Sequence, residues 1–138
     1  MPFNKPVLGL DLGTRRIGVA LSDAGGIMAF PHSVIKSKGA EKDMAAILSL
    51  AHEHEAGIIV VGLPRSMNGQ LGPEAQRVEA FVAVLRQQPL PVETWDESFT
   101  SVDAERLLRE AGTKDKSKVD ALAAALILQA YLDHQRGK

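Results

Sequence analysis

The segment from Val7 to Asp23, VLGLDLGTRRIGVALSD, constrains the fold more than any other part of the chain. The apolar runs Val7–Leu10 and Ile17–Leu21 are each typical of a buried strand, and Gly13 between them suits a turn. We therefore expect a β-hairpin that carries Asp11 at its inner edge. A carboxylate there can hold a divalent cation, although Asp11 and Gly13 would also serve as ordinary turn residues.

Basic side chains follow Asp11 in the expected turn. Arg15 and Arg16, with the backbone amides around Gly13 and Thr14, could face phosphate oxygens. The charge of the whole chain does not indicate a nucleic-acid-binding protein, because 16 Lys and Arg residues and 17 Asp and Glu residues give a net charge of −1. A site for a polyanion must therefore be a local patch.

Length and composition narrow the class of protein. With 138 residues, the chain is most simply one domain over residues 1–138 with a substantial core. The absence of Cys excludes disulfides, thiolate zinc sites and cysteine nucleophiles. Apolar runs are far shorter than the roughly 20 residues of a membrane helix, and the N-terminus lacks the apolar region of a signal peptide. We expect a cytoplasmic protein that does not enter the membrane.

A further apolar run indicates that the sheet also contains parallel strands. Gly57–Leu63, GIIVVGL, is typical of a strand covered on both faces, and it follows a helical pattern, which favours a parallel strand beside the first. Pro31 makes the third strand an irregular or edge strand. The expected strands cover residues 7–10, 17–21, 27–35, 57–63 and 92–95, and the expected helices cover residues 43–54, 73–88, 100 onward and 117–135. This order predicts a mixed α/β sheet with helices on its faces.

Loops that follow parallel strands are where α/β sheets bind ligands. Arg65, Ser66 and Asn68 follow the 57–63 strand and are candidate substrate contacts. Lys114, Lys116 and Lys118 form the densest positive charge in the chain, although such a run is commonly a solvated loop.

Three carboxylates can converge on one edge of this sheet. Asp11 ends the first strand, Glu97 follows the last, and Asp120 opens the final helix, where it could instead form a capping box with Ser117. Three close carboxylates repel one another unless cations neutralise them, so the grouping predicts Mg²⁺ or Mn²⁺. Asp96 is also acidic, and strand alternation sends Asp96 and Glu97 to opposite sides, so only one of the two should reach the metals. The chemistry implied is metal-assisted hydrolysis of a phosphodiester.

Four linked motifs resemble the YqgF/RuvX family, whose members are described as pre-16S rRNA nucleases and as Holliday junction resolvase-like proteins. These motifs are LDLGTRRIGVALSD, VVGLPRSMNG followed by GPEA, WDESFTSVDAERLL, and KVDALAAALILQAYLD. The resemblance covers almost the whole chain. It implies a ribonuclease H-like fold with a mixed five-stranded sheet, a divalent-metal nuclease site, and a nucleic-acid substrate.

The resemblance carries the family's three acidic positions onto Asp11, Glu97 and Asp120 as metal ligands and catalytic residues. From the residues themselves we further predict phosphate or substrate contacts at five positions, namely Arg16, Arg65, Asn68, Lys116 and Lys118. This chain has Ser98 where the family usually has Arg, which removes a phosphate contact or a carboxylate partner. The substrates implied are pre-16S rRNA at its 5′ end, or branched or single-stranded DNA, and the partners are nucleic acid and pre-ribosomal particles.

Two other functions stay open on the sequence alone. The DLGT hairpin also resembles the phosphate-binding hairpin of the actin, Hsp70 and sugar-kinase superfamily, which would make this an ATP-binding protein. The chain could also be a non-catalytic nucleic-acid-binding factor in ribosome assembly whose acids no longer act. The sequence is compatible with a monomer or a homodimer, since the apolar last helix could pack within one subunit or between two.

Overall fold

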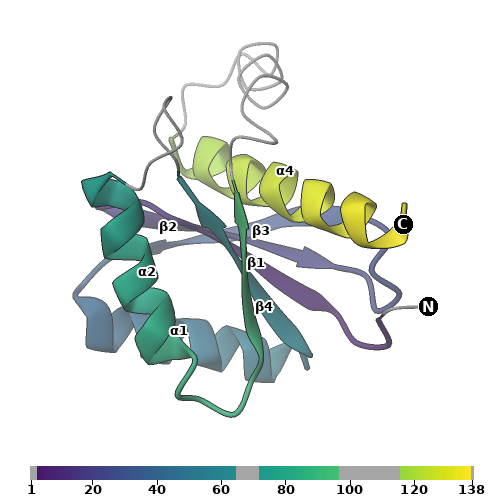
Figure 1. The fold of residues 1–138 in the computed structure, drawn as a ribbon, viewed down its shortest axis with the longest axis horizontal. Coiled ribbons are helices and arrows are strands. Elements are labelled where there is room, and N and C mark those ends of the chain that lie inside the picture. Colours follow the sequence, from purple (N-terminus) through teal and green to yellow (C-terminus); the bar gives the residue numbers. More distant parts are fainter. Residues whose placement is uncertain (1–2, 65–71, 97–115, 138) are drawn as a thin grey trace.

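The computed structural model describes residues 3–64, 72–96 and 116–137. Its centre is a five-stranded mixed sheet with the strand order β3-β2-β1-β4-β5 (Figure 1). The strands are β1 Val7–Leu12, β2 Arg16–Ser22, β3 Ala29–Lys36, β4 Ile58–Leu63 and β5 Val92–Asp96. β1 pairs antiparallel with β2 and parallel with β4, which confirms the expected hairpin and the expected parallel strand beside it.

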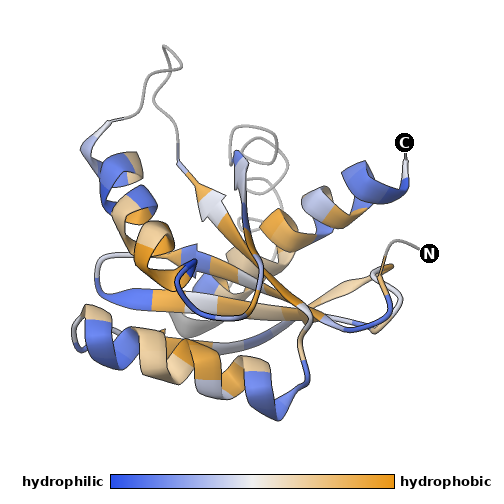
Figure 2. Ribbon diagram, turned by 60° about the horizontal axis from the view of Figure 1, so that its bottom comes forward, coloured by the Kyte–Doolittle hydropathy of each residue, from blue (hydrophilic) through white to orange (hydrophobic). Residues whose placement is uncertain are grey.

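Helices cover both faces of the sheet. The described helices are α1 Ala40–Glu53, α2 Pro73–Leu85 and α4 Lys116–Arg136. α1 and α2 pack on one face, where Ile47 and Val78 share a core with Leu10, whereas α4 packs on the other, where Leu128 meets Val7. Figure 2 shows the apolar sides of these helices turned toward the sheet. No helix in the described ranges is long and apolar enough to cross a membrane.

The pleat of β1 divides its side chains between the two cores. Leu8, Leu10 and Leu12 belong to the core beneath α1 and α2, and Val7 belongs to the core beneath α4. Because alternate residues of a strand share a face, Gly9 and Asp11 lie on the α4 side with Val7. Asp11 is thus directed to the face that carries the last helix.

The helix α1 begins at Ala40, three residues earlier than its apolar pattern predicts. Gly39 has a φ of 112°, a conformation that a side chain would disfavour, and it turns the chain into the helix. The Asp43 carboxylate then accepts hydrogen bonds from the Ser37 hydroxyl at 2.6 Å and the Lys38 amide at 2.9 Å. The Asp43 carboxylate thus ties the first turn of α1 to the two residues before Gly39.

The strand β3 lies at the edge of the sheet, as Pro31 predicts. Its register against β2 shifts between Val19 and Ala20, so that Val19 pairs with Ser33 and Ala20 with Pro31. His32 is the extra residue of this bulge, which fits a position beside a proline that cannot donate to the ladder. The helix expected to begin near Thr100 lies outside the described residues.

Candidate active site

Two glycines let α4 approach the sheet closely above the hairpin. A Cβ added to Gly9 would lie 2.9 Å from the Cβ of Leu128, and one added to Gly18 would lie 2.0 Å from the backbone oxygen of Asp120. Gly18 pairs directly with Asp11 across the β1–β2 ladder. The start of α4 therefore rests on β2 beside Asp11, which brings together two acids 109 positions apart in the numbering of the chain.

Arg16 forms an ion pair with the second of these acids. Its Nε donates to Asp120 Oδ2 at 2.5 Å, and the two side chains are 31% and 25% exposed. A charge-assisted hydrogen bond of this kind fixes the orientation of the carboxylate as well as offsetting its charge. The side chain of Ser117, the partner in the alternative capping role of Asp120, lies outside those described, and the contact described for the Asp120 carboxylate is the one from Arg16.

The environment of Asp11 penalises its charge. Burial, with the nearby negative charge of Asp120, raises the pKa of Asp11 from 3.8 to about 6. Among the described residues, the ion pair with Arg16 offsets one of the two negative charges. Half-buried carboxylate oxygens with unfavourable mutual repulsion are a donor set that fits a hard divalent cation.

We expect Asp11→Asn to stabilise the metal-free protein at high pH. The folded-state pKa of Asp11 lies above its ordinary value, so its charged form costs stability above pH 6, and that cost disappears as the pH falls below about 4. Urea unfolding in the presence of a chelator should therefore show a gain of about 2 kcal/mol at pH 8, discounted for partial solvent access, and almost none at pH 4. Equal effects at both pH values would contradict a charge-based penalty at this site.

The structure describes only part of the predicted site. It brings Asp11 and Asp120 together and places Arg16 on Asp120, whereas Glu97 lies outside the described residues. Asp96 pairs with Leu63, whose side chain belongs to the core beneath α1 and α2, so Asp96 lies on the face away from Asp11. Within the described ranges, no group of three acidic or His side chains could hold a metal ion.

The predicted substrate contacts are described less fully. Arg65 and Asn68 lie outside the described residues. Lys116 and Lys118 belong to the first turn of α4, but their side chains are not among those described. The role of Gly18 is one that sequence reasoning missed, although a glycine inside a strand often marks the close approach of another backbone.

The fold is shared with solved structures of RuvC and of a viral resolvase, each in complex with a Holliday junction. The structure titled "T. thermophilus RuvC in complex with Holliday junction substrate" matches with a TM-score of 0.63 and 17% identity, over 97% of each chain. The Fowlpox virus resolvase in complex with Holliday junction DNA matches with a TM-score of 0.57 and 8% identity, over 94% of this chain and 98% of that one. These likenesses define a ribonuclease H-like fold of the resolvase type and confirm the predicted fold class.

Sequence comparison then gives the family. The chain belongs to the RuvX family, described as Holliday junction resolvase, whose profile matches residues 5–134. A relative from Thermoanaerobacter pseudethanolicus is 44% identical over 96% of this chain and 99% of its own length, and one from Pelotomaculum thermopropionicum is 47% identical over 94% and 87%. Both carry the name "Putative pre-16S rRNA nuclease". The resemblance seen in the motifs is confirmed, and the chain is a nuclease.

Proposed function

We propose that the chain is a divalent-metal-dependent nuclease that hydrolyses phosphodiester bonds with Asp11, Glu97 and Asp120 as its catalytic and metal-binding residues. The observation that carries this proposal is the closeness of Asp11 and Asp120 on the α4 face, where burial and then repulsion from Asp120 raise the pKa of Asp11 to about 6. Trp95 packs on the same face, and Glu97 stands two residues further along the chain, which is the spacing of residues that share a strand face.

Asp11, Asp120 and Arg16 each have a role in this proposed chemistry. Mg²⁺ or Mn²⁺ bound by the carboxylates would activate a water and stabilise the leaving oxygen of the phosphodiester. Asp11 supplies ligand oxygens from the end of β1, and Asp120 supplies them from α4 with its orientation fixed by Arg16. Because the Arg16 side chain is 31% exposed, its guanidinium can also meet a phosphate oxygen of the substrate.

The substrate we infer is the 5′ end of pre-16S rRNA, with branched or single-stranded DNA as a second class. The names of the curated relatives support the first, and the resolvase-type fold supports the second. Arg65, Asn68, Lys116 and Lys118 would grip the backbone of the nucleic acid, within pre-ribosomal particles in the cytoplasm. A monomer suffices for trimming an end, whereas paired cuts in a four-way junction require a symmetric homodimer.

A cleavage panel tests the proposal. Single-stranded RNA carrying the 5′ precursor sequence of 16S rRNA, single-stranded DNA, duplex DNA and a four-way junction are incubated with Mg²⁺, with Mn²⁺ and with a chelator. We expect cleavage that requires the metal and disappears in Asp11→Asn. Tight RNA binding with no metal-dependent cleavage of any substrate would instead support a non-catalytic role in ribosome assembly.

Neutralising Lys116 and Lys118 together should weaken binding by reducing phosphate attraction. If both contact a single strand, the slope of log K against log salt should become less steep by about 1.4 in Lys116→Gln/Lys118→Gln, since each contact contributes roughly 0.7. Fluorescence anisotropy of a labelled oligonucleotide over a salt series in chelator measures the slope. Lys5→Gln/Lys42→Gln, which changes charge elsewhere, is the control, and an unchanged slope in the α4 variant would remove the assignment.

A further inference from the structure

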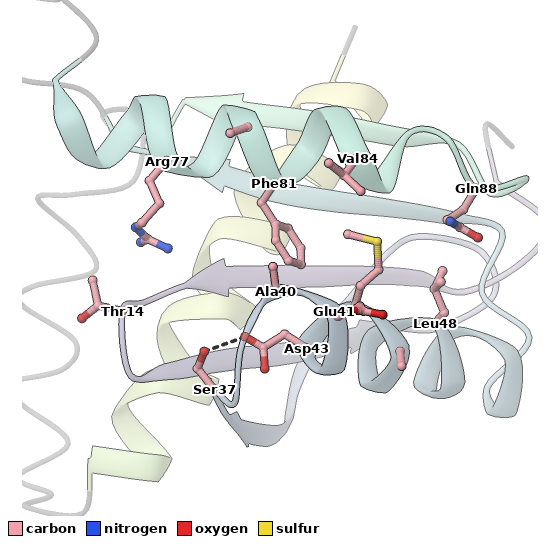
Figure 3. Close-up of a pocket in the computed structure, with 13 residues that line it drawn as sticks. Thr14, Ser37, Ala40, Glu41, Asp43, Leu48, Arg77, Phe81, Val84 and Gln88 are labelled. Carbon is pink, nitrogen blue, oxygen red and sulfur yellow. Dashed lines mark hydrogen bonds between the residues drawn. The ribbon is translucent and has the colours of Figure 1, made fainter.

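The backbone just after Asp11 is held by a side chain from α2. The Nη2 of Arg77 donates to the carbonyl oxygen of Leu12 at 2.8 Å, across a sequence separation of 65 residues. Figure 3 shows Arg77 at the same end of the pocket between α1 and α2 as Thr14, which belongs to the hairpin turn. This contact reaches the turn from the face opposite to Asp120.

The hairpin explains why the Leu12 carbonyl is available to Arg77. The Gly13 amide donates to the Arg16 carbonyl at 3.0 Å, so these two residues form a hydrogen-bonded pair. Such pairs alternate with non-hydrogen-bonded pairs in an antiparallel ladder, and the carbonyl of the neighbouring residue Leu12 therefore points away from β2 and toward β4. The residue pairs between β1 and β4 end at Leu10 and Val61. Leu12 therefore lies beyond the last pair of the parallel ladder, and Arg77 supplies a donor where that ladder stops.

Arg77 is itself held in place. Its Nε and Nη2 both donate to Glu74 Oε1, at 3.2 Å and 2.6 Å, one turn earlier on α2. A fixed guanidinium fork offers a donor with a defined direction, which a flexible ammonium group does not. The turn is also held on its other side, where the Ser37 amide donates to the Arg15 carbonyl at 2.9 Å. The chain segment after Asp11 is thus held from α2 and from the end of β3.

We propose that Arg77 is a positioning residue for Asp11, because it fixes the end of β1 and so fixes where the Asp11 carboxylate meets the metal and substrate. This inference rests on the proposed metal-dependent nuclease function. Arg77 would touch neither the metal nor the scissile bond. Residues that orient metal ligands typically change metal affinity or activity by 10- to 100-fold when they are removed.

The test compares Arg77→Met and Arg77→Lys with Arg86→Met. Arg86 follows α2 and donates through Nε to the Val92 carbonyl at 3.2 Å. Arg86→Met therefore removes a similar contact between an arginine and a backbone carbonyl, but at the other end of the sheet. Amide hydrogen exchange at Gly13, Mn²⁺ affinity by calorimetry, and kcat and KM for cleavage are measured on the full chain. Arg77→Met should speed exchange at Gly13, weaken Mn²⁺ binding by about 10-fold and lower kcat more than KM changes. Arg77→Lys should lie between Arg77→Met and wild type.

Other outcomes would overturn the inference. Unchanged exchange at Gly13 in Arg77→Met would show that Arg77 does not hold the turn, and an equal loss of Mn²⁺ affinity in Arg86→Met would show a general effect on stability. If Arg77→Lys behaved like the wild-type protein in every measurement, the positive charge of Arg77 would account for its effect, and the directed guanidinium fork would not be needed. A wild-type chain that neither binds Mn²⁺ nor cleaves would contradict the proposed function instead, and exchange at Gly13 would still decide whether Arg77 positions the turn.

Discussion

Replacing Asp11 with Asn should lower metal-dependent cleavage by about 1,000-fold, which corresponds to a loss of several kcal/mol of transition-state stabilisation. Asn has nearly the same shape as Asp but supplies one neutral oxygen where the carboxylate supplies two charged ones. Asp11 pairs with Gly18 across the hairpin and lies beside Asp120 on the α4 face, so the substitution changes one of the two proposed metal ligands that the structure describes. Initial rates with Mg²⁺ and with Mn²⁺ on a labelled substrate measure the effect.

Loss of activity must be separated from loss of the fold. Because Asp11 is penalised as an anion, Asp11→Asn should unfold at a higher urea concentration than wild type at pH 8, so reduced cleavage cannot be ascribed to unfolding. Asp133→Asn provides a matched control on α4, since Asp133 pairs with Arg136 on the same helix, away from the hairpin. Cleavage by Asp133→Asn should stay within about twofold of wild type, and retention of full activity by Asp11→Asn would refute the assignment of the site.

A methyl group at Gly18 should disturb both stability and activity. The Cβ of Gly18→Ala would lie 2.0 Å from the backbone oxygen of Asp120, so the first turns of α4 must move away from β2. Forcing extra volume into a close contact of this kind costs about 1–3 kcal/mol. The shift would also separate Asp120 from Asp11, so metal affinity should fall by more than the stability loss alone explains. Urea unfolding and Mn²⁺ calorimetry measure the two effects.

Gly72→Ala is the matched control for this substitution. Gly72 has a φ of −78° and open space around its Cα, so a methyl group there meets nothing within 4 Å. Its stability should change by less than about 1 kcal/mol, because the restriction of the unfolded chain by alanine is offset by the lower preference for alanine at the N-cap of α2. A Gly18→Ala protein as stable as Gly72→Ala, with metal affinity unchanged, would mean that α4 does not need to approach β2 this closely.

The strands could be predicted from sequence because their apolar runs are short and bounded by Gly or Pro. Gly57–Leu63 gave a parallel strand within one residue of its observed start, and Pro31 placed its strand at the edge. The start of α1 was wrong by three residues. The residues from Ala40 to Lys42 carry no apolar period, and the contacts of the Asp43 side chain with Ser37 and Lys38 arise only in the folded chain.

The closeness of Asp11 and Asp120 could be predicted from the sequence, whereas the contacts around them could not. Asp11 and Asp120 could be placed at one edge because strand order and helix order fix where strand ends and helix starts lie. The contact of Arg16 with Asp120 could not be predicted, because these residues are 104 positions apart and meet only when α4 packs against Gly18. Arg77 had no sequence signal at all, because its acceptor is a backbone carbonyl that any residue could supply.

The bulge in β3 has a consequence for how the protein behaves in a crowded solution. An edge strand with a free row of amides and carbonyls is a template onto which another chain can add. In β3 the register breaks at His32, and Pro31 has no N–H to offer an incoming strand. A second chain could not form an unbroken ladder along this edge, so the protein is protected there from open-ended aggregation.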